Sequence, residues 1–202
     1  MKNLAELVFI VDRSGSMSNI ATDMEGAIKS VLKDQKEKHK GEIRVTFVRF
    51  DTEYEEVFSN TPIGEVEDIS IKPRGGTALL DAMGRTINSF ERRFSETDKK
   101  NRPKRVLFLI ITDGEENSSR EYLRDKVFGI IETIKRDHNW GFTFIGANQD
   151  AIAEGGHLGI GRSDSLNYDA SHEGVRCMVQ DVSSYTSSFL ATGEANYDEK
   201  II

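Results

Sequence analysis

Apolar residues follow two different periods along the 202-residue chain. Continuous apolar runs occupy Leu7–Val11 and Val106–Ile111, and such runs are typical of strands buried on both faces. Elsewhere, apolar residues recur three and four positions apart, which predicts helices with one buried face. Strands that alternate with helices indicate a mostly parallel sheet covered on both faces. The pattern therefore predicts an α/β fold of the doubly wound, Rossmann-like class.

Four further segments complete the expected six-stranded sheet. Ile43–Phe50 opens with alternating apolar residues, so we expect it to be less deeply buried than the two apolar runs. Tyr54–Asn60 follows after three residues, a link that permits only an antiparallel hairpin, so it should be the antiparallel edge strand. Trp140–Ala147 and Leu166–Tyr168 are the expected fifth and sixth strands. In the common order 3-2-1-4-5-6, the first and fourth strands are neighbours.

Helical stripes of apolar residues occur in four segments. They contain Met24, Ala27, Ile28, Val31 and Leu32; Leu79, Met83, Ile87, Phe90 and Phe94; Leu123, Val127, Ile130 and Ile134; and Val175, Met178, Val182, Tyr185 and Phe189. We interpret all four as faces that pack against the sheet. The only cysteine, Cys177, lies beside the last stripe, so we expect a packed thiol and no internal disulfide.

Composition and charge narrow the possible partners. With 37% hydrophobic and 30% charged residues, the chain fits one globular domain over residues 1–202. No run approaches the roughly 18 apolar residues that a membrane helix needs. The formal net charge of −7 disfavours nucleic acid and anionic membranes, which both favour a basic surface. The single cysteine and the lack of a recognisable leader peptide favour a cytoplasmic protein.

Oxygen-bearing side chains follow the first and fourth strands. Asp12, Ser14 and Ser16 stand at alternate positions after the first strand, in the sequence V-D-R-S-G-S-M-S. Asp113 follows the fourth strand in I-T-D-G, and Thr77 ends R-G-G-T just before a helical stripe. Because neighbouring parallel strands end at the same edge, we expect the two aspartates to face each other. Their repulsion predicts either a shared proton or a cation at this edge.

The hydroxyl groups beside these aspartates favour a cation. A ligand set of oxygen atoms without Cys or His suits Mg²⁺, with Mn²⁺ or Ca²⁺ as alternatives. A different interpretation remains open for each motif. Asp12, Ser14 and Ser16 could form a polar turn that caps the next helix, and Thr77 could cap the helix that follows it.

Other polar residues near the same edge have different predicted roles. We interpret Asp81, one turn into the helix after Thr77, as a structural acceptor and not as a ligand. Glu115, Glu116 and Asn117 could line the rim of the site, although acidic runs are usually solvated. Asn148 and Asp150 follow the fifth strand and could contact a ligand. The four histidines lack the spacing of a zinc site.

The combination of D-x-S-x-S, a later Thr and a later Asp resembles the metal-ion-dependent adhesion site of the von Willebrand factor A family. The resemblance covers nearly the whole chain, and F-I-G-A-N-Q-D at Phe144–Asp150 looks like its stand-alone bacterial members. It implies that Ser14, Ser16 and Thr77 bind the metal, with both aspartates bound directly or through water. It further implies an open coordination position for an Asp or Glu of a protein partner. The expected function is a metal-dependent binding module without enzymatic activity.

Two alternative functions remain. A Mg²⁺-dependent phosphohydrolase of the haloacid dehalogenase type also has an Asp after its first strand, but it needs a second carboxylate two residues later as acid and base. Ser14 occupies that position, and no cap domain is evident, so we disfavour this function. A scaffold subunit of an ATPase assembly would use the metal site only for docking, and the sequence does not distinguish it from the first function.

Overall fold

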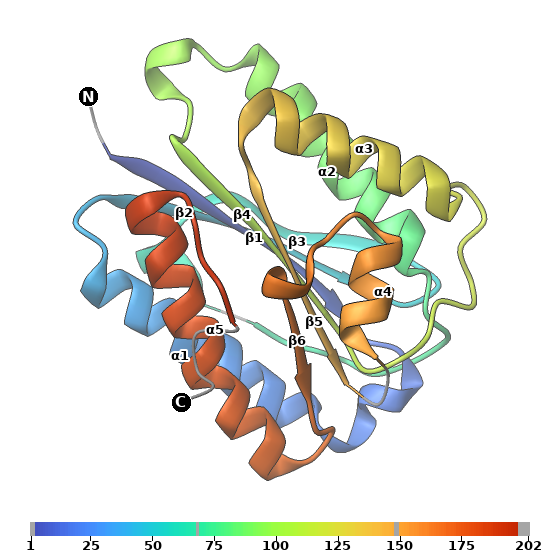
Figure 1. The fold of residues 1–202 in the computed structure, drawn as a ribbon. Coiled ribbons are helices and arrows are strands. Elements are labelled where there is room, and N and C mark those ends of the chain that lie inside the picture. Colours follow the sequence, from blue (N-terminus) through green and yellow to red (C-terminus); the bar gives the residue numbers. More distant parts are fainter. Residues whose placement is uncertain (1–2, 68, 148–149, 198–202) are drawn as a thin grey trace.

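The structure is a computed structural model that describes residues 3–67, 69–147 and 150–197. Its centre is one six-stranded sheet in the order β3-β2-β1-β4-β5-β6 (Figure 1). β2 and β3 pair antiparallel, and the four other pairs are parallel. The predicted fold class, strand order and antiparallel edge strand are therefore confirmed.

The strands are β1 (Leu4–Asp12), β2 (Glu42–Phe50), β3 (Tyr54–Pro62), β4 (Arg105–Thr112), β5 (Gly141–Ala147) and β6 (Ser165–Tyr168). The helices are α1 (Ala21–Lys38), α2 (Leu79–Glu96), α3 (Arg124–His138), α4 (Ala151–His157) and α5 (His172–Thr192). Short 3-10 turns, η1 (Gly15–Asn19), η2 (Ile63–Glu65), η3 (Lys99–Asn101) and η4 (Arg162–Asp164), lie in the connections.

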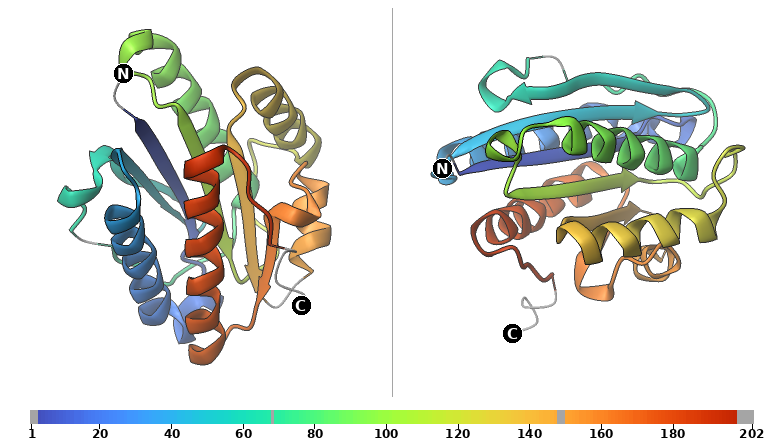
Figure 2. Two further views of the ribbon diagram at one scale, coloured as in Figure 1. Left: turned by 60° about the vertical axis from the view of Figure 1, so that its left-hand side comes forward. Right: turned by 90° about the horizontal axis from the view of Figure 1, so that it is seen from above.

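Helices cover both faces of the sheet, so the molecule has three layers (Figure 2). α1 and α5 pack on one face, where they bury Leu7 and Phe9 of β1. α2, α3 and α4 cover the other face, where Val8 and Ile10 of the same strand are buried. This double burial explains why β1 and β4 have continuous apolar sequences instead of alternating ones.

β2 is less deeply buried than β1 and β4, as its sequence predicts, because Glu42, Arg44 and Arg49 are only partly buried, but the middle of the strand is fully enclosed. It lies between β1 and β3, and Val45, Phe47 and Val48 are fully buried. Thr46, which interrupts the apolar pattern, is also buried and donates a hydrogen bond of 2.7 Å to Glu6 on β1. The polar position therefore belongs to a buried polar pair and does not face solvent.

The stripes of α1, α2 and α5 face the sheet as predicted, but two predictions about side chains were wrong. In α3, Val127 and Ile134 are buried, whereas Leu123 is 77% exposed. The helix begins one residue after Leu123, whose backbone is extended and therefore directs it away from the stripe. Cys177 is exposed. It precedes the buried Met178 by one residue, which is a rotation of about 100° around the helix.

Candidate metal site

The parallel pairing of β1 with β4 brings the two aspartate motifs to one edge of the sheet. The register runs from Ala5 opposite Arg105 to Val11 opposite Ile111, so both strands end together. Thr112, the last residue of β4, donates a hydrogen bond of 2.6 Å to Asp12 Oδ2. We call this edge, with Asp12, Ser14, Ser16, Thr77 and Asp113, the metal edge.

A chain of hydrogen bonds connects the D-x-S-x-S turn to the segment after β4. The backbone N–H of Ser14 donates to Asp12 Oδ1 at 2.6 Å, which closes the turn. Ser14 Oγ lies 2.9 Å from Ser16 Oγ, and Ser16 Oγ donates to Asp113 Oδ1 at 2.6 Å. The side-chain oxygens of all four residues are therefore within reach of one another.

The Thr77 hydroxyl lies close to the side-chain oxygens of Asp12 and Ser16, on one side of Gly114. A Cβ atom built on Gly114 would lie 3.1 Å from Thr77 Oγ1, 3.3 Å from Ser16 Oγ and 3.7 Å from Asp12 Oδ2. Three oxygen atoms, two from the D-x-S-x-S turn and one from Thr77, thus surround one point, and a glycine leaves that point free of side-chain atoms. All five residues that the sequence singled out are brought together.

Thr77 does not cap α2, which was the alternative interpretation of this residue. The helix begins at Leu79, and its N-cap residue is Ala78, without a side-chain capping bond. Thr77 is instead held through its backbone, because its N–H donates to Asn117 Oδ1 at 3.0 Å and its carbonyl accepts from Asn117 N–H. Its hydroxyl is therefore available to the metal edge.

Burial makes both carboxyl groups of the metal edge costly to ionise. Asp12 is 0% exposed, and burial raises its pKa to about 6, although hydrogen bonds from Thr112 and Ser14 lower it and the charge of Asp113 raises it. Burial also raises the pKa of Asp113, and the Ser16 hydrogen bond partly opposes that shift. Across the described parts of the chain, no Lys, Arg or His pairs with either carboxyl group.

The other buried acidic residues in the described structure all have compensation. Glu6 receives hydrogen bonds from Arg93 at 2.6 and 3.2 Å. Asp51 contacts two arginines at 2.7 and 2.9 Å, and Asp81 accepts hydrogen bonds from three backbone N–H groups in residues 120–122. Asp81 is thus the structural acceptor that the sequence predicted. Only the carboxyl groups of the metal edge are buried without a positive partner or a full set of donors.

The sequence profile described as the von Willebrand factor type A domain matches residues 6–174. This chain belongs to the von Willebrand factor A family. The match spans the D-x-S-x-S turn, Thr77 and Asp113, on which the resemblance was based. No curated protein sequence matches the chain significantly.

Solved structures share this von Willebrand factor A fold. Proximal thread matrix protein 1 from the mussel byssus, with a zinc-occupied MIDAS motif, has a TM-score of 0.65 at 14% identity, over 92% of this chain and 46% of that chain. The PilB minor pilin from Streptococcus sanguinis has a TM-score of 0.60 at 14% identity, over 94% and 63%. A von Willebrand factor type A protein from Catenulispora acidiphila has a TM-score of 0.61 at 13% identity, over 90% and 42%. The chain spans less than two thirds of each, and such identities show the fold alone.

The rim residues of this von Willebrand factor A domain have mostly structural contacts. Glu116 accepts hydrogen bonds from the N–H groups of Leu80 and Ser118, so it ties the segment after β4 to α2 and is not a purely solvated residue. Glu115 is exposed. Asp150 caps α4 by accepting bonds from two backbone N–H groups, and Asn148 lies outside the described residues.

The sequence placed Asn117 only at the rim of the site and gave Thr112 and Gly114 only as part of the I-T-D-G motif, so the contacts by which these three residues support the metal edge were missed. Thr112 hydrogen-bonds Asp12, Asn117 holds the backbone of Thr77, and Gly114 leaves space for the converging oxygens. Thr112 and Gly114 flank Asp113 in the sequence, so the I-T-D-G motif carried a signal for them. Asn117 was expected at the rim, but its bond to Thr77 was not predicted, because that contact depends on how the segment after β4 packs on α2.

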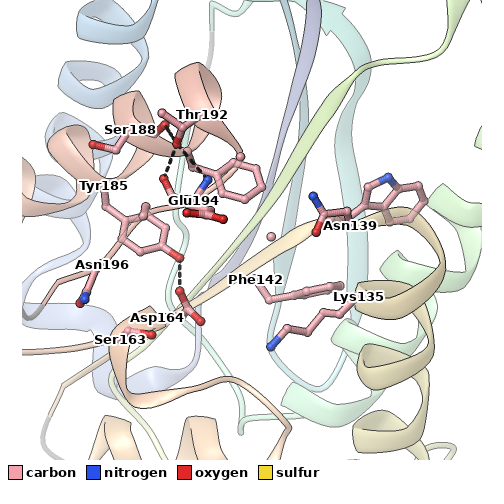
Figure 3. Close-up of a pocket in the computed structure, with 15 residues that line it drawn as sticks. Lys135, Asn139, Phe142, Ser163, Asp164, Tyr185, Ser188, Thr192, Glu194 and Asn196 are labelled. Atoms are coloured by element: carbon pink, nitrogen blue, oxygen red, sulfur yellow. Dashed lines mark hydrogen bonds between the residues drawn. The ribbon is translucent and has the colours of Figure 1, made fainter.

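A separate cavity of about 700 Å³ lies near the start of β5, at the end of the strand opposite to the metal edge (Figure 3). It is lined by the end of α3, by Gly141 at the start of β5 and by the end of α5. In it, the Tyr185 hydroxyl donates to Asp164 at 2.5 Å, and burial raises the pKa of Asp164. None of the five residues of the metal edge lines this cavity. The two features are therefore independent.

Proposed function

We propose that the chain is a single metal-dependent protein-binding domain whose metal edge holds one divalent cation and binds a carboxylate of a protein partner. The observation that carries this proposal is the pair of buried carboxyl groups, Asp12 and Asp113, without a positive partner beside converging hydroxyl oxygens. A buried charge is stable when it is paired or when it coordinates a metal. The described residues supply no positive partner, so a cation is the expected compensation.

The residues present fit a hard cation. Ser14, Ser16 and Thr77 would supply neutral oxygens, and Asp12 and Asp113 would bind directly or through water. A divalent cation would offset the two negative charges, so an incoming carboxylate would no longer be repelled. When bound, the cation would supply an electrophilic centre at which that carboxylate replaces water.

The donor set favours Mg²⁺ over other ions, with Mn²⁺ as a close substitute. In the part of the chain that the structure describes, no group of three or more His, Cys, Asp and Glu side chains could hold a metal. Dedicated zinc sites mostly use Cys and His, and Ca²⁺ takes six to eight oxygens, often from several carboxylates. A site with two carboxylates, three hydroxyls and retained water suits the smaller octahedral ion.

Enzymatic function is disfavoured on the same grounds. A phosphohydrolase needs an acid and base two residues after its nucleophilic aspartate. That position is Ser14, whose N–H closes the turn onto Asp12. We therefore propose a binding module and no catalytic step.

The proposed location is the cytoplasm. Cys177 is exposed and unpaired, and a free surface thiol fits a reducing compartment. None of the described helices is long and apolar enough to cross a bilayer.

The test combines a metal measurement with a partner measurement. About tenfold excess of Mg²⁺ over its dissociation constant should add about 1.4 kcal/mol to the free energy of unfolding, or about 2–4 °C in melting temperature. Ca²⁺ should have a smaller effect, and the double variant Ser14→Ala/Ser16→Ala should lose the response. An unchanged melting temperature across millimolar Mg²⁺ and Mn²⁺ would refute the site.

The partner arm uses capture from the native host by the wild type and by the same double variant, each with Mg²⁺ and with chelator. A specific partner should be retained only by the wild type with Mg²⁺. It should be lost after its contact-face Asp and Glu residues are changed to Asn and Gln. A partner that is held equally in chelator would show that binding uses another surface.

A further inference from the structure

An ion-pair network centred on a buried aspartate joins the loops of the metal edge, and its residues are not part of the proposed ligand set. Its centre is Asp51, which follows β2 and is 1% exposed. Oδ2 of Asp51 lies 2.9 Å from Arg13 Nε and accepts a hydrogen bond of 2.7 Å from Arg74 Nε. These two arginines belong to the two separate loops that carry the hydroxyl groups of the metal edge.

Arg13 connects Asp51 to the D-x-S-x-S turn. It is the residue between Asp12 and Ser14, and its side chain is buried. Its backbone N–H donates to Phe50 O at 2.7 Å, and its guanidinium contacts the Asp51 carboxylate. The turn is therefore fixed to the end of β2 by both main chain and side chain.

Arg74 and Gly75 connect Asp51 to the R-G-G-T loop. Ala78 N–H donates to the carbonyl of Asp51 at 3.0 Å, directly after Thr77. Gly75 has a φ of +67°, and a Cβ atom there would lie 3.5 Å from Asp51 Cβ, so the loop packs closely over this aspartate. Both the start and the end of the loop thus depend on one residue.

The two loops also bond to each other across this aspartate. Arg74 N–H donates to Arg13 O at 2.8 Å, and Gly15 N–H donates to Gly75 O at 3.1 Å. These backbone bonds set the register of the loops, and the shared carboxylate between two guanidiniums holds them together. The position of Thr77 relative to Ser14 and Ser16 depends on this arrangement.

We propose that Asp51 is a positioning residue for the cation, which fixes the Thr77 hydroxyl against the Ser14 and Ser16 hydroxyls by joining Arg13 to Arg74. This inference rests on the proposed function. Residues that orient metal ligands without touching the metal change its affinity by about 10–100-fold when they are altered. Asp51 contributes no ligand atom, and its effect acts through the geometry of the two loops.

The experiment measures Mg²⁺ affinity by calorimetry and melting temperature in chelator, for the wild type, Asp51→Asn, Arg74→Gln and Glu55→Gln. Glu55→Gln is the matched control, since Glu55 also pairs with Arg13, at 2.7 Å, and the change is again carboxylate to amide. Glu55 contacts Arg13 and Arg49 and has no bond to the R-G-G-T loop. Arg74→Gln should fold readily, because the Arg74 side chain is 52% exposed.

We expect Asp51→Asn and Arg74→Gln to weaken Mg²⁺ binding by about 10–100-fold, while Glu55→Gln stays within about twofold of the wild type. A merely structural role would lower the melting temperature of Asp51→Asn in chelator and leave its affinity for Mg²⁺ equal to that of Glu55→Gln, which would overturn the inference. If Asp51→Asn does not fold, Arg74→Gln decides alone, and an unchanged affinity there overturns the inference. Failure of the wild type to bind Mg²⁺ would instead refute the proposed function.

Discussion

The two ends of β1 carry buried carboxyl groups in opposite circumstances. Glu6, near the start of the strand, is 1% exposed and accepts hydrogen bonds from Arg93 and Thr46. Asp12, at the end of the same strand, is equally buried but accepts hydrogen bonds from Thr112 and Ser14, and no Lys, Arg or His among the described residues pairs with it. Burial is the same, and only the compensation of charge differs.

This contrast separates a carboxylate that the chain neutralises from the two carboxylates that we propose bind a metal. A charge that the chain neutralises with its own arginine needs nothing from outside. A buried charge left without such a partner favours a proton or a cation, and the neighbouring Asp113 strengthens that preference. A missing counter-charge is therefore a better indicator of the site than burial.

The largest expected effect comes from removing the compensation of Glu6. Arg93→Ala should lower the free energy of unfolding by about 3–4 kcal/mol, because it leaves a buried carboxylate unpaired. Urea unfolding in chelator measures this, with Arg93→Lys as a milder control that keeps the charge. A loss below about 1 kcal/mol would mean that Arg93 contributes little to the stability of the buried Glu6, and the contrast with Asp12 would weaken.

A pH series tests the uncompensated end of the strand. The pKa of Asp12 rises from 3.8 to about 6 on folding without a cation, so the folded state binds its proton more tightly than the unfolded state. The resulting stability is complete below about pH 4 and is lost as the pH rises to about 6, and the raised pKa of Asp113 acts in the same direction.

In chelator, the wild type should therefore lose about 2–3 kcal/mol between about pH 4 and 6 relative to Asp12→Asn. Saturating Mg²⁺ should remove this difference, since a cation favours the ionised carboxylate. Parallel stability curves for the two proteins in chelator would contradict the assignment.

The smallest effect should come from Asp113→Asn. In chelator this variant should be as stable as the wild type or more stable by up to about 1 kcal/mol, because the change relieves repulsion and keeps an acceptor for Ser16. It should also abolish stabilisation by Mg²⁺. Asp81→Asn is the matched control: it weakens a carboxylate that holds three N–H groups, so it should destabilise the domain. If Asp113→Asn is unfolded in chelator, Asp113 has a structural role and its assignment to the metal site is wrong.

The sequence predicted most of the fold because its strands and stripes are local patterns. The continuous runs in β1 and β4 identified the central strands, and the short link before Tyr54 identified the antiparallel edge. Local patterns did not predict the exposure of a residue at a helix end or the burial of a polar residue in the sheet. Leu123 precedes its helix by one residue, and Thr46 is buried through a bond to Glu6 on the neighbouring strand.

The sequence predicted which residues supply oxygen atoms to the candidate site, but it did not predict the contacts that hold those residues in place. Asp12, Ser14 and Ser16 share one turn, so their spacing alone indicates a common target. The role of Asp51 depends on contacts with Arg13 and Arg74 that are 38 and 23 positions away. No spacing rule connects residues so far apart, because loop packing after folding brings them together.

The pairing of β1 with β4 also has a kinetic consequence. The hydrogen bond from Thr112 to Asp12 joins residues 100 positions apart, so the metal edge exists only after two distant strands have met. Contacts of such long range form late, since the chain must first close a large loop. A cation at this edge would therefore bind the finished domain and not a folding intermediate. It would slow unfolding while leaving the rate of folding nearly unchanged.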